Sequence, residues 1–158
     1  MNSLETVRLL VSVSVIGLLA LAGCDSDSPT DPGHENVPAV AQVFDRDTGA
    51  LLAYTHGTGA GIHWDGGIPH LHVGEEIELD IVFLNDDGEE IAYGSEFEAR
   101  ARLADGSPTG VIQFANHGDH IDVEAIGEGE AYLVLMFWHR HADWGWETPP
   151  LEFEGDDH

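Results

Sequence analysis

The chain contains no lysine and only five basic residues, all of them arginine, against 30 acidic residues. Binding to nucleic acid or to anionic lipid requires a basic face that neutralises phosphates, and this composition does not supply one. The acidity has two ordinary explanations, a solvated surface suited to a saline environment or a diffuse attraction for cations. Nucleic acid is therefore excluded as a partner, and metal cations remain open.

Sulfur is also scarce. Cys24 is the only cysteine, so the chain cannot form an internal disulfide, and Met136 is the one methionine beyond residue 24. Cu(I) favours soft sulfur ligands, which are missing here. Any metal site must therefore use histidine, aspartate and glutamate, and the chain has ten histidines.

A long hydrophobic run is lacking as well. The apolar stretch from Leu9 to Leu21 is short for a membrane span and has the length of a signal peptide's apolar region. It ends in Leu21-Ala22-Gly23-Cys24, which resembles the lipobox of bacterial lipoproteins. The resemblance implies removal of residues 1–23, a lipid on Cys24 and a place in the cell envelope, periplasmic or surface-exposed. The alternative is a transmembrane anchor with an incidental cysteine.

Residues 24–38 are rich in Asp, Ser, Pro and Gly, which predicts a flexible tether, and residues 39–158 form the predicted domain. Alternating apolar residues and turn signals predict strands throughout that domain, and no convincing amphipathic helix is present. The expected strands are a hairpin of 41–44 and 50–55, then 77–83, 97–103, 111–115, 121–125, 131–138 and an edge strand at 149–154. The glycine-rich segment 57–67 is a long loop or a loose strand. The pattern predicts an all-β fold, an antiparallel β-sandwich of about seven strands plus the N-terminal hairpin.

Two segments resemble bacterial Ig-like domains of the group 2 type. Leu71 to Leu79 and then Phe83 to Ile91 contain a Val-Gly-Glu turn, a strand and an Asp-Gly turn, as such domains do at their start. Ile121 to Leu133 is similar to their closing segment. The resemblance implies an Ig-like sandwich but no activity, because the same fold serves many functions. The middle, Gly94 to Pro108, departs from the family pattern, and the histidine pairs are no part of it.

The histidines come in closely spaced pairs, which points to a metal site. His139 and His141 end the strand 131–138, and residues two apart in extended chain point to the same side. Alternating strand directions place the His117–His120 turn at the same end of the sandwich. Zinc is held by three or four such ligands. The predicted ligands are His117, His120, His139 and His141, with Asp119 and Asp143 as further ligands or as groups that orient an imidazole.

Four more histidines are second-choice ligands. His70 and His72 are expected at the opposite end of the sandwich, where they could form a weaker site with His56 or His63. For every pair the alternative is a strand-end or turn histidine that only bonds nearby groups. The tryptophans near the C-terminus are interpreted as packing and rim residues.

An imidazole-rich site favours Zn²⁺, with Cu²⁺ and Ni²⁺ as alternatives. Ca²⁺ is less favoured, because the acidic turn Asn85 to Glu90 lacks the spaced aspartates of a calcium loop. We expect a lipoprotein that captures, buffers or delivers a divalent metal, with an envelope protein or transporter as a possible partner and an affinity that falls below about pH 6. The alternative is an Ig-like structural or adhesion module with incidental or purely structural histidines. An enzyme is not expected, because neither His-Glu-x-x-His nor a Ser-His-Asp arrangement occurs.

Overall fold

A computed structural model describes residues 37–157 of the chain. The predicted signal peptide, Cys24 and nearly all of the predicted tether lie outside the described residues. In the described part no helix is long and apolar enough to cross a membrane.

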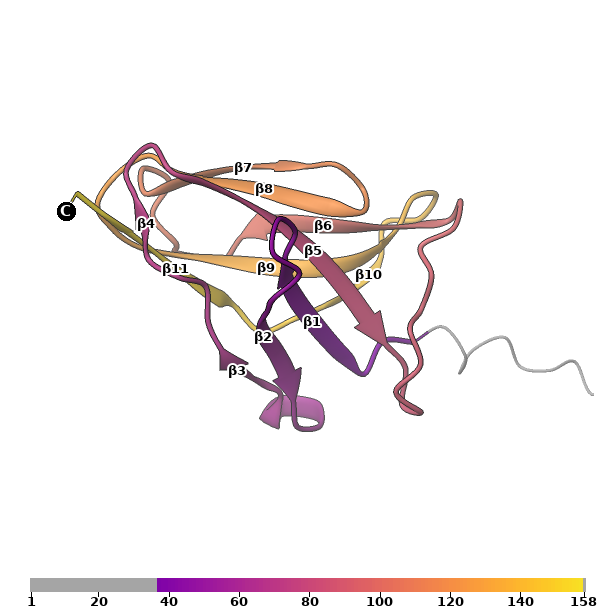
Figure 1. The fold of residues 1–158 in the computed structure, drawn as a ribbon. Helices are drawn as coiled ribbons and strands as arrows, with labels where there is room; N and C mark the ends of the chain where they lie inside the picture. Colours follow the sequence, from indigo (N-terminus) through magenta and orange to yellow (C-terminus); the bar gives the residue numbers. More distant parts are fainter. Residues whose placement is uncertain (1–36, 158) are drawn as a thin grey trace, which may run out of the picture. The chain divides into compact units, whose positions relative to one another are not determined.

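The first sheet has six strands, and each neighbouring pair is antiparallel (Figure 1). From one edge to the other they are β3 (His63–Gly66), β2 (Leu51–His56), β1 (Val40–Asp45), β5 (Glu76–Leu84), β8 (His120–Ala125) and β7 (Ile112–Asn116). The predicted N-terminal hairpin is β1 and β2. Its turn is closed by a hydrogen bond from the amide of Gly49, at a φ of 69°, to the carbonyl of Asp45.

The second sheet is built around β9 (Gly129–His139), the longest of the described strands. β6 (Phe97–Leu103) pairs along one side of β9. On the other side lie β10 (Gly145–Glu147) and β11 (Leu151–Asp156), and β11 in turn pairs with β4 (Leu71–His72). A single 3-10 turn, η1 (Gly59–Gly61), completes the described elements.

The core lies between the two sheets. Leu79, Ile81 and Phe83 of β5 alternate with less buried residues, whereas β9 is buried at every position from 133 to 137. Phe83 of β5 and Phe137 of β9 pack edge to face, with ring centroids 5.3 Å apart, and Trp146 of β10 packs on Phe83 at 5.8 Å. Burying such apolar surface is the main stabilisation of the sandwich.

The predicted all-β sandwich is confirmed, with three differences in detail. β11 was expected at a sheet edge, but it lies between β9 and β4. β4 and β11 run parallel, so the sandwich is not purely antiparallel. The short strands β4 and β10 were not expected, because two or three residues carry too little periodicity to be recognised in a sequence, and of the two expectations for 57–67 the strand is realised as β3.

One feature of the packing holds the β7–β8 turn in place. The Asn116 side chain bonds both backbone groups of Ala101 on β6, accepting from the amide at 2.6 Å and donating to the carbonyl at 3.2 Å. The carbonyl of Gly118 accepts a further bond from the amide of Ala99, at 2.7 Å. The turn between β7 and β8 is therefore tied to the second sheet.

Candidate metal sites

Two groups of three side chains in the described residues could hold a metal ion. The first, which we call the hairpin group, consists of His117, His120 and Asp122 in the β7–β8 hairpin. The second, the edge group, consists of His56, His63 and Asp65 on β2 and β3. In each group one ligand atom per residue lies within 4.8 Å of the others.

The hairpin group forms because side chains along β8 point alternately to the core and to the surface. Ile121 and Val123 point into the core, so His120 and Asp122 both face outward from the same side of the strand. His117 closes the turn with a backbone bond from its amide to the carbonyl of His120, at 3.0 Å. The two imidazole rings stack with centroids 4.5 Å apart and an angle of 9° between their planes.

Hydrogen bonds orient both imidazoles. Nδ1 of His120 donates to Oδ1 of Asp119 at 2.7 Å, which leaves Nε2 as the free nitrogen of that ring. Nε2 of His117 lies 2.7 Å from Oδ2 of Asp122. The bond from His120 is the main reason that the pKa of Asp119 is lowered, and the charges of His120 and Arg46 act in the same direction.

The remaining oxygen of the hairpin group lacks a normal partner. Oδ1 of Asp122 is buried and makes no hydrogen bond with any of the described residues. Its neighbour in the group is Nε2 of His120, 3.7 Å away, which is too long for a hydrogen bond. A buried carboxylate oxygen is normally satisfied, so this oxygen is a position at which a cation could bind.

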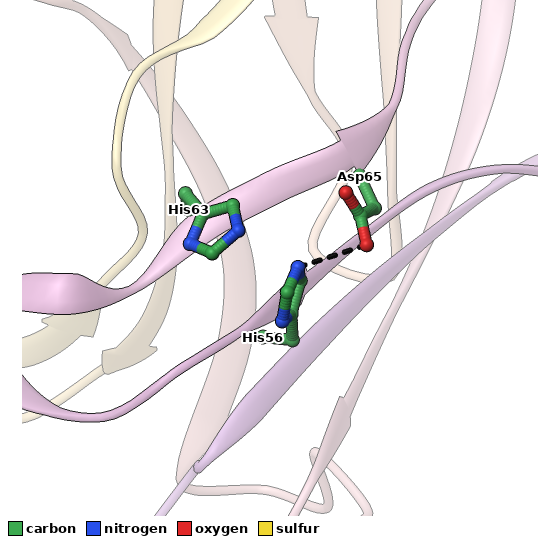
Figure 2. A group of neighbouring side chains, drawn as sticks. All are labelled: His56, His63 and Asp65. Atoms are coloured by element: carbon green, nitrogen blue, oxygen red, sulfur yellow. Dashed lines mark ion pairs between the residues drawn. The ribbon is translucent and has the colours of Figure 1, made fainter.

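The edge group lies on the outer face of the β2–β3 ribbon. His56 and His63 are directly opposite each other in the register, with ring centroids 3.9 Å apart. Asp65 is two residues further along β3, and its Oδ2 is 2.8 Å from Nε2 of His56. Figure 2 shows His63 and Asp65 on one strand and His56 on the other, with the ring of His56 facing the carboxylate.

Two further contacts hold the edge group. Nδ1 of His63 lies 2.9 Å from the carbonyl of Gly61, and because a carbonyl can only accept, this nitrogen carries the proton. The Tyr54 hydroxyl donates to Oδ2 of Asp65 at 3.1 Å. That hydrogen bond, followed by the charge of Asp65, raises the pKa of Tyr54.

The structure does not bring His139 and His141 into either group. β9 ends at His139 and the chain turns at once, so the rule that residues two apart share a side does not apply to His141. Nδ1 of His139 accepts the amide of His141 at 3.2 Å, and its ring contacts the rings of Phe97 and Trp144. Glu98 and Arg140 lie beside Gly118, next to the hairpin group.

The other candidates take separate positions. His70 and His72 pair with β11, the first with Glu154 at 3.0 Å and the second with Asp156 at 2.8 Å. The expected site of His70 and His72 with His56 or His63 is therefore not formed. His56 and His63 lie beside Asp65 instead. Asp143 lines a surface hollow with His141, Arg140 and Trp138, which is also apart from both groups.

Sequence reasoning missed the two carboxylates that complete the groups, Asp122 and Asp65. Both stand two residues after a histidine, in His120-Ile121-Asp122 and His63-Trp64-Asp65. The same strand periodicity that pointed to His139 and His141 could have found them.

No known family model matches the chain, and no curated protein matches it. The side chains of the two groups and their surroundings are therefore the support for metal binding.

Proposed function

We propose that the protein is a lipid-anchored envelope protein that binds a divalent transition metal, first of all zinc, at the hairpin group. The observation that carries the proposal is the buried, unbonded Oδ1 of Asp122 beside the free Nε2 of His120. An ion between these two atoms satisfies the carboxylate oxygen and uses the one imidazole nitrogen that Asp119 leaves available.

The spacing of the two atoms suits a tetrahedral ion. Ligand atoms about 2.0 Å from a zinc ion lie about 3.3 Å apart in a tetrahedron. Nε2 of His120 and Oδ1 of Asp122 are 3.7 Å apart, so a shift of a few tenths of an ångström is enough. His117 becomes the third ligand when its Nε2, which bonds Oδ2 of Asp122 in the metal-free protein, releases its proton to solvent, the ring takes a proton on Nδ1 instead, and Nε2 turns to the ion.

The donor set selects the kind of metal. Two imidazoles and one carboxylate suit Zn²⁺, Cu²⁺ or Ni²⁺, whereas Ca²⁺ takes six to eight oxygens. The bond from His120 to Asp119 is the carboxylate–histidine arrangement that commonly supports a zinc ligand, because it fixes the ring and makes the other nitrogen more basic.

Access to the group favours an exchangeable ion. The side chain of His117 retains 43% of its full exposure, and three protein ligands leave a tetrahedral ion with a fourth position for water or for a ligand from another molecule. Capture, buffering or delivery of the metal requires such an open position. The lipobox at Cys24 would hold this activity at the envelope.

The test is calorimetric titration of the full-length lipidated protein in detergent with zinc. Asp122→Asn keeps the shape of the side chain and removes its charge, so we expect the loss of one binding event. The double variant His139→Ala, His141→Ala is the matched control, and it should bind as the wild type does. If the wild type binds no zinc below about 1 mM, or if Asp122→Asn leaves the titration unchanged, the proposal fails.

Anchoring is tested separately by Cys24→Ser in a bacterial host. The wild type should incorporate radiolabelled palmitate and sediment with membranes, and the variant should do neither. Unchanged labelling of the variant would contradict a lipid on Cys24.

A further inference from the structure

The two groups lie at opposite edges of the same sheet. The strand order places β3 at one edge and β7 at the other, with β1, β5 and their neighbours between them (Figure 1). The edge group is therefore a separate structure that shares no residue with the hairpin group. Its chemistry can be considered independently, since distant sites contribute independently to stability and binding.

We propose that the edge group is a second divalent-metal site, in which the ion bridges β2 and β3 and clamps the edge strand to the sheet. His56 contributes from β2, and His63 and Asp65 contribute from β3. This proposal does not depend on metal binding at the hairpin group.

The ligands of the edge group already have supporting contacts. Because Nδ1 of His63 donates to the carbonyl of Gly61, its Nε2 carries the lone pair that a metal requires. Asp65 is held by the Tyr54 hydroxyl, and it lies on the same outer face as both histidines. Directly opposite residues of an antiparallel pair have Cβ atoms about 5 Å apart, a separation from which two imidazoles can reach one ion.

The position of the group gives the ion a mechanical role. β3 has four residues, and among the described strands it pairs with β2 alone. The connection from β2 is the glycine-rich segment around η1, where Gly57 and Gly59 have positive φ values of 103° and 55°. Trp64 attaches β3 further, because its side chain packs against the core and its Nε1 donates to the carbonyl of Pro149 at 2.9 Å.

Short edge strands of this kind open locally at low cost in free energy. An ion bound by both strands binds only the closed ribbon, so it suppresses opening by a factor close to 1 + [L]/Kd. At a zinc concentration about 100 times Kd, opening of β3 should become about a hundredfold rarer. The proposed result is a ribbon whose closure depends on metal.

The test is amide hydrogen exchange of the full-length protein with and without zinc, followed on peptides that cover residues 57–67. In the wild type we expect zinc to slow exchange of these amides by at least about tenfold. Asp122→Asn should show the same slowing, because its change lies at the hairpin group. The two proposals can fail separately, because a protein can lose zinc binding at one group and keep zinc binding at the other.

Two variants of the edge group and one control complete the experiment. His63→Ala and Asp65→Asn should each lose the effect of zinc, measured against the zinc-free exchange of the same variant. His70→Ala removes another exposed histidine that faces a carboxylate, Glu154, and should respond as the wild type does. The proposal is overturned if zinc up to about 1 mM protects none of these amides in the wild type, or protects them equally in His63→Ala and Asp65→Asn.

Discussion

Nε2 of His120 lies 3.7 Å from the buried Oδ1 of Asp122, and the same imidazole donates from its other nitrogen to Asp119. Asp122 stands between two histidines, so its role in the metal-free fold can be separated from its role as a ligand. An amide in its place can still accept the bond from His117, but it is a poor metal ligand.

We expect Asp122→Asn to change the free energy of unfolding of the metal-free protein by no more than about 1 kcal/mol, as for other partly exposed ion pairs. In saturating zinc the wild type should gain more stability than this variant does, because the ion adds stability only to the fold that binds it. Urea denaturation of both proteins, with zinc and with a chelator, measures the difference. A variant that gains as much as the wild type would show that Asp122 is not a ligand.

Asp119 should act on the metal through His120. Asp119→Ala leaves the ligands in place but removes the group that orients the ring, so we expect zinc affinity at the hairpin group to fall about 10-fold to 100-fold. Asp119→Asn can still accept the hydrogen bond and should lie between the wild type and Asp119→Ala. Calorimetry gives the affinities. Equal losses in both variants would mean that the turn itself, rather than the hydrogen bond, is disturbed.

The fold could be predicted further than the site. The predicted strand Phe97–Leu103 is β6 residue for residue, because the alternation of buried alanines with charged side chains is a local signal. The prediction that two histidine pairs form one site depended on the direction of side chains just after a strand ends. β9 stops at His139, and the direction of His141 is then decided by the turn into β10, which periodicity does not describe.

The edge group could not be predicted from the sequence for a related reason. The pairing of His56 with His63 is a register between two strands joined by a glycine-rich connection. Register depends on the geometry of that connection. At the end of β3 itself, Gly66 at a φ of 83° allows the backbone to approach the carbonyl of Leu52 closely. A Cβ there would lie 2.3 Å from that oxygen, so the position requires glycine.

Tyr93 should make the protein sensitive to alkaline pH. Its side chain packs on Phe83 and Phe137 and donates its hydroxyl to the carbonyl of Ile81. Burial is the main cause that raises its pKa well above the ordinary value, and the charges of Glu90, Asp119 and Asp80 add to it.

The direction in which stability changes with pH follows from the protons that the folded and unfolded chains bind. Above the ordinary tyrosine pKa of about 10, the unfolded chain releases the phenolic proton while the folded chain keeps it. The stability linked to Tyr93 is therefore complete below about pH 10 and is lost as pH rises beyond it. Urea midpoints measured from pH 8 to pH 11 should fall less steeply for Tyr93→Phe than for the wild type. Tyr132→Phe, an exposed control, should change the slope less.

The buried hydroxyl of Thr55 should be essential to the β1–β2 pairing that carries His56. Its Oγ1 accepts the amide of Ala41 at 2.8 Å, and the Thr55 side chain is fully buried. Thr55→Val keeps the shape but leaves that amide without a partner, so we expect the free energy of unfolding to fall by about 1–3 kcal/mol. Thr48→Val is the matched control: its Oγ1 accepts the Ala50 amide at 3.3 Å in an exposed turn, and its cost should stay within about 0.5 kcal/mol. Chemical denaturation of the two variants decides the matter, since equal effects would mean that burial of the hydrogen bond is unimportant.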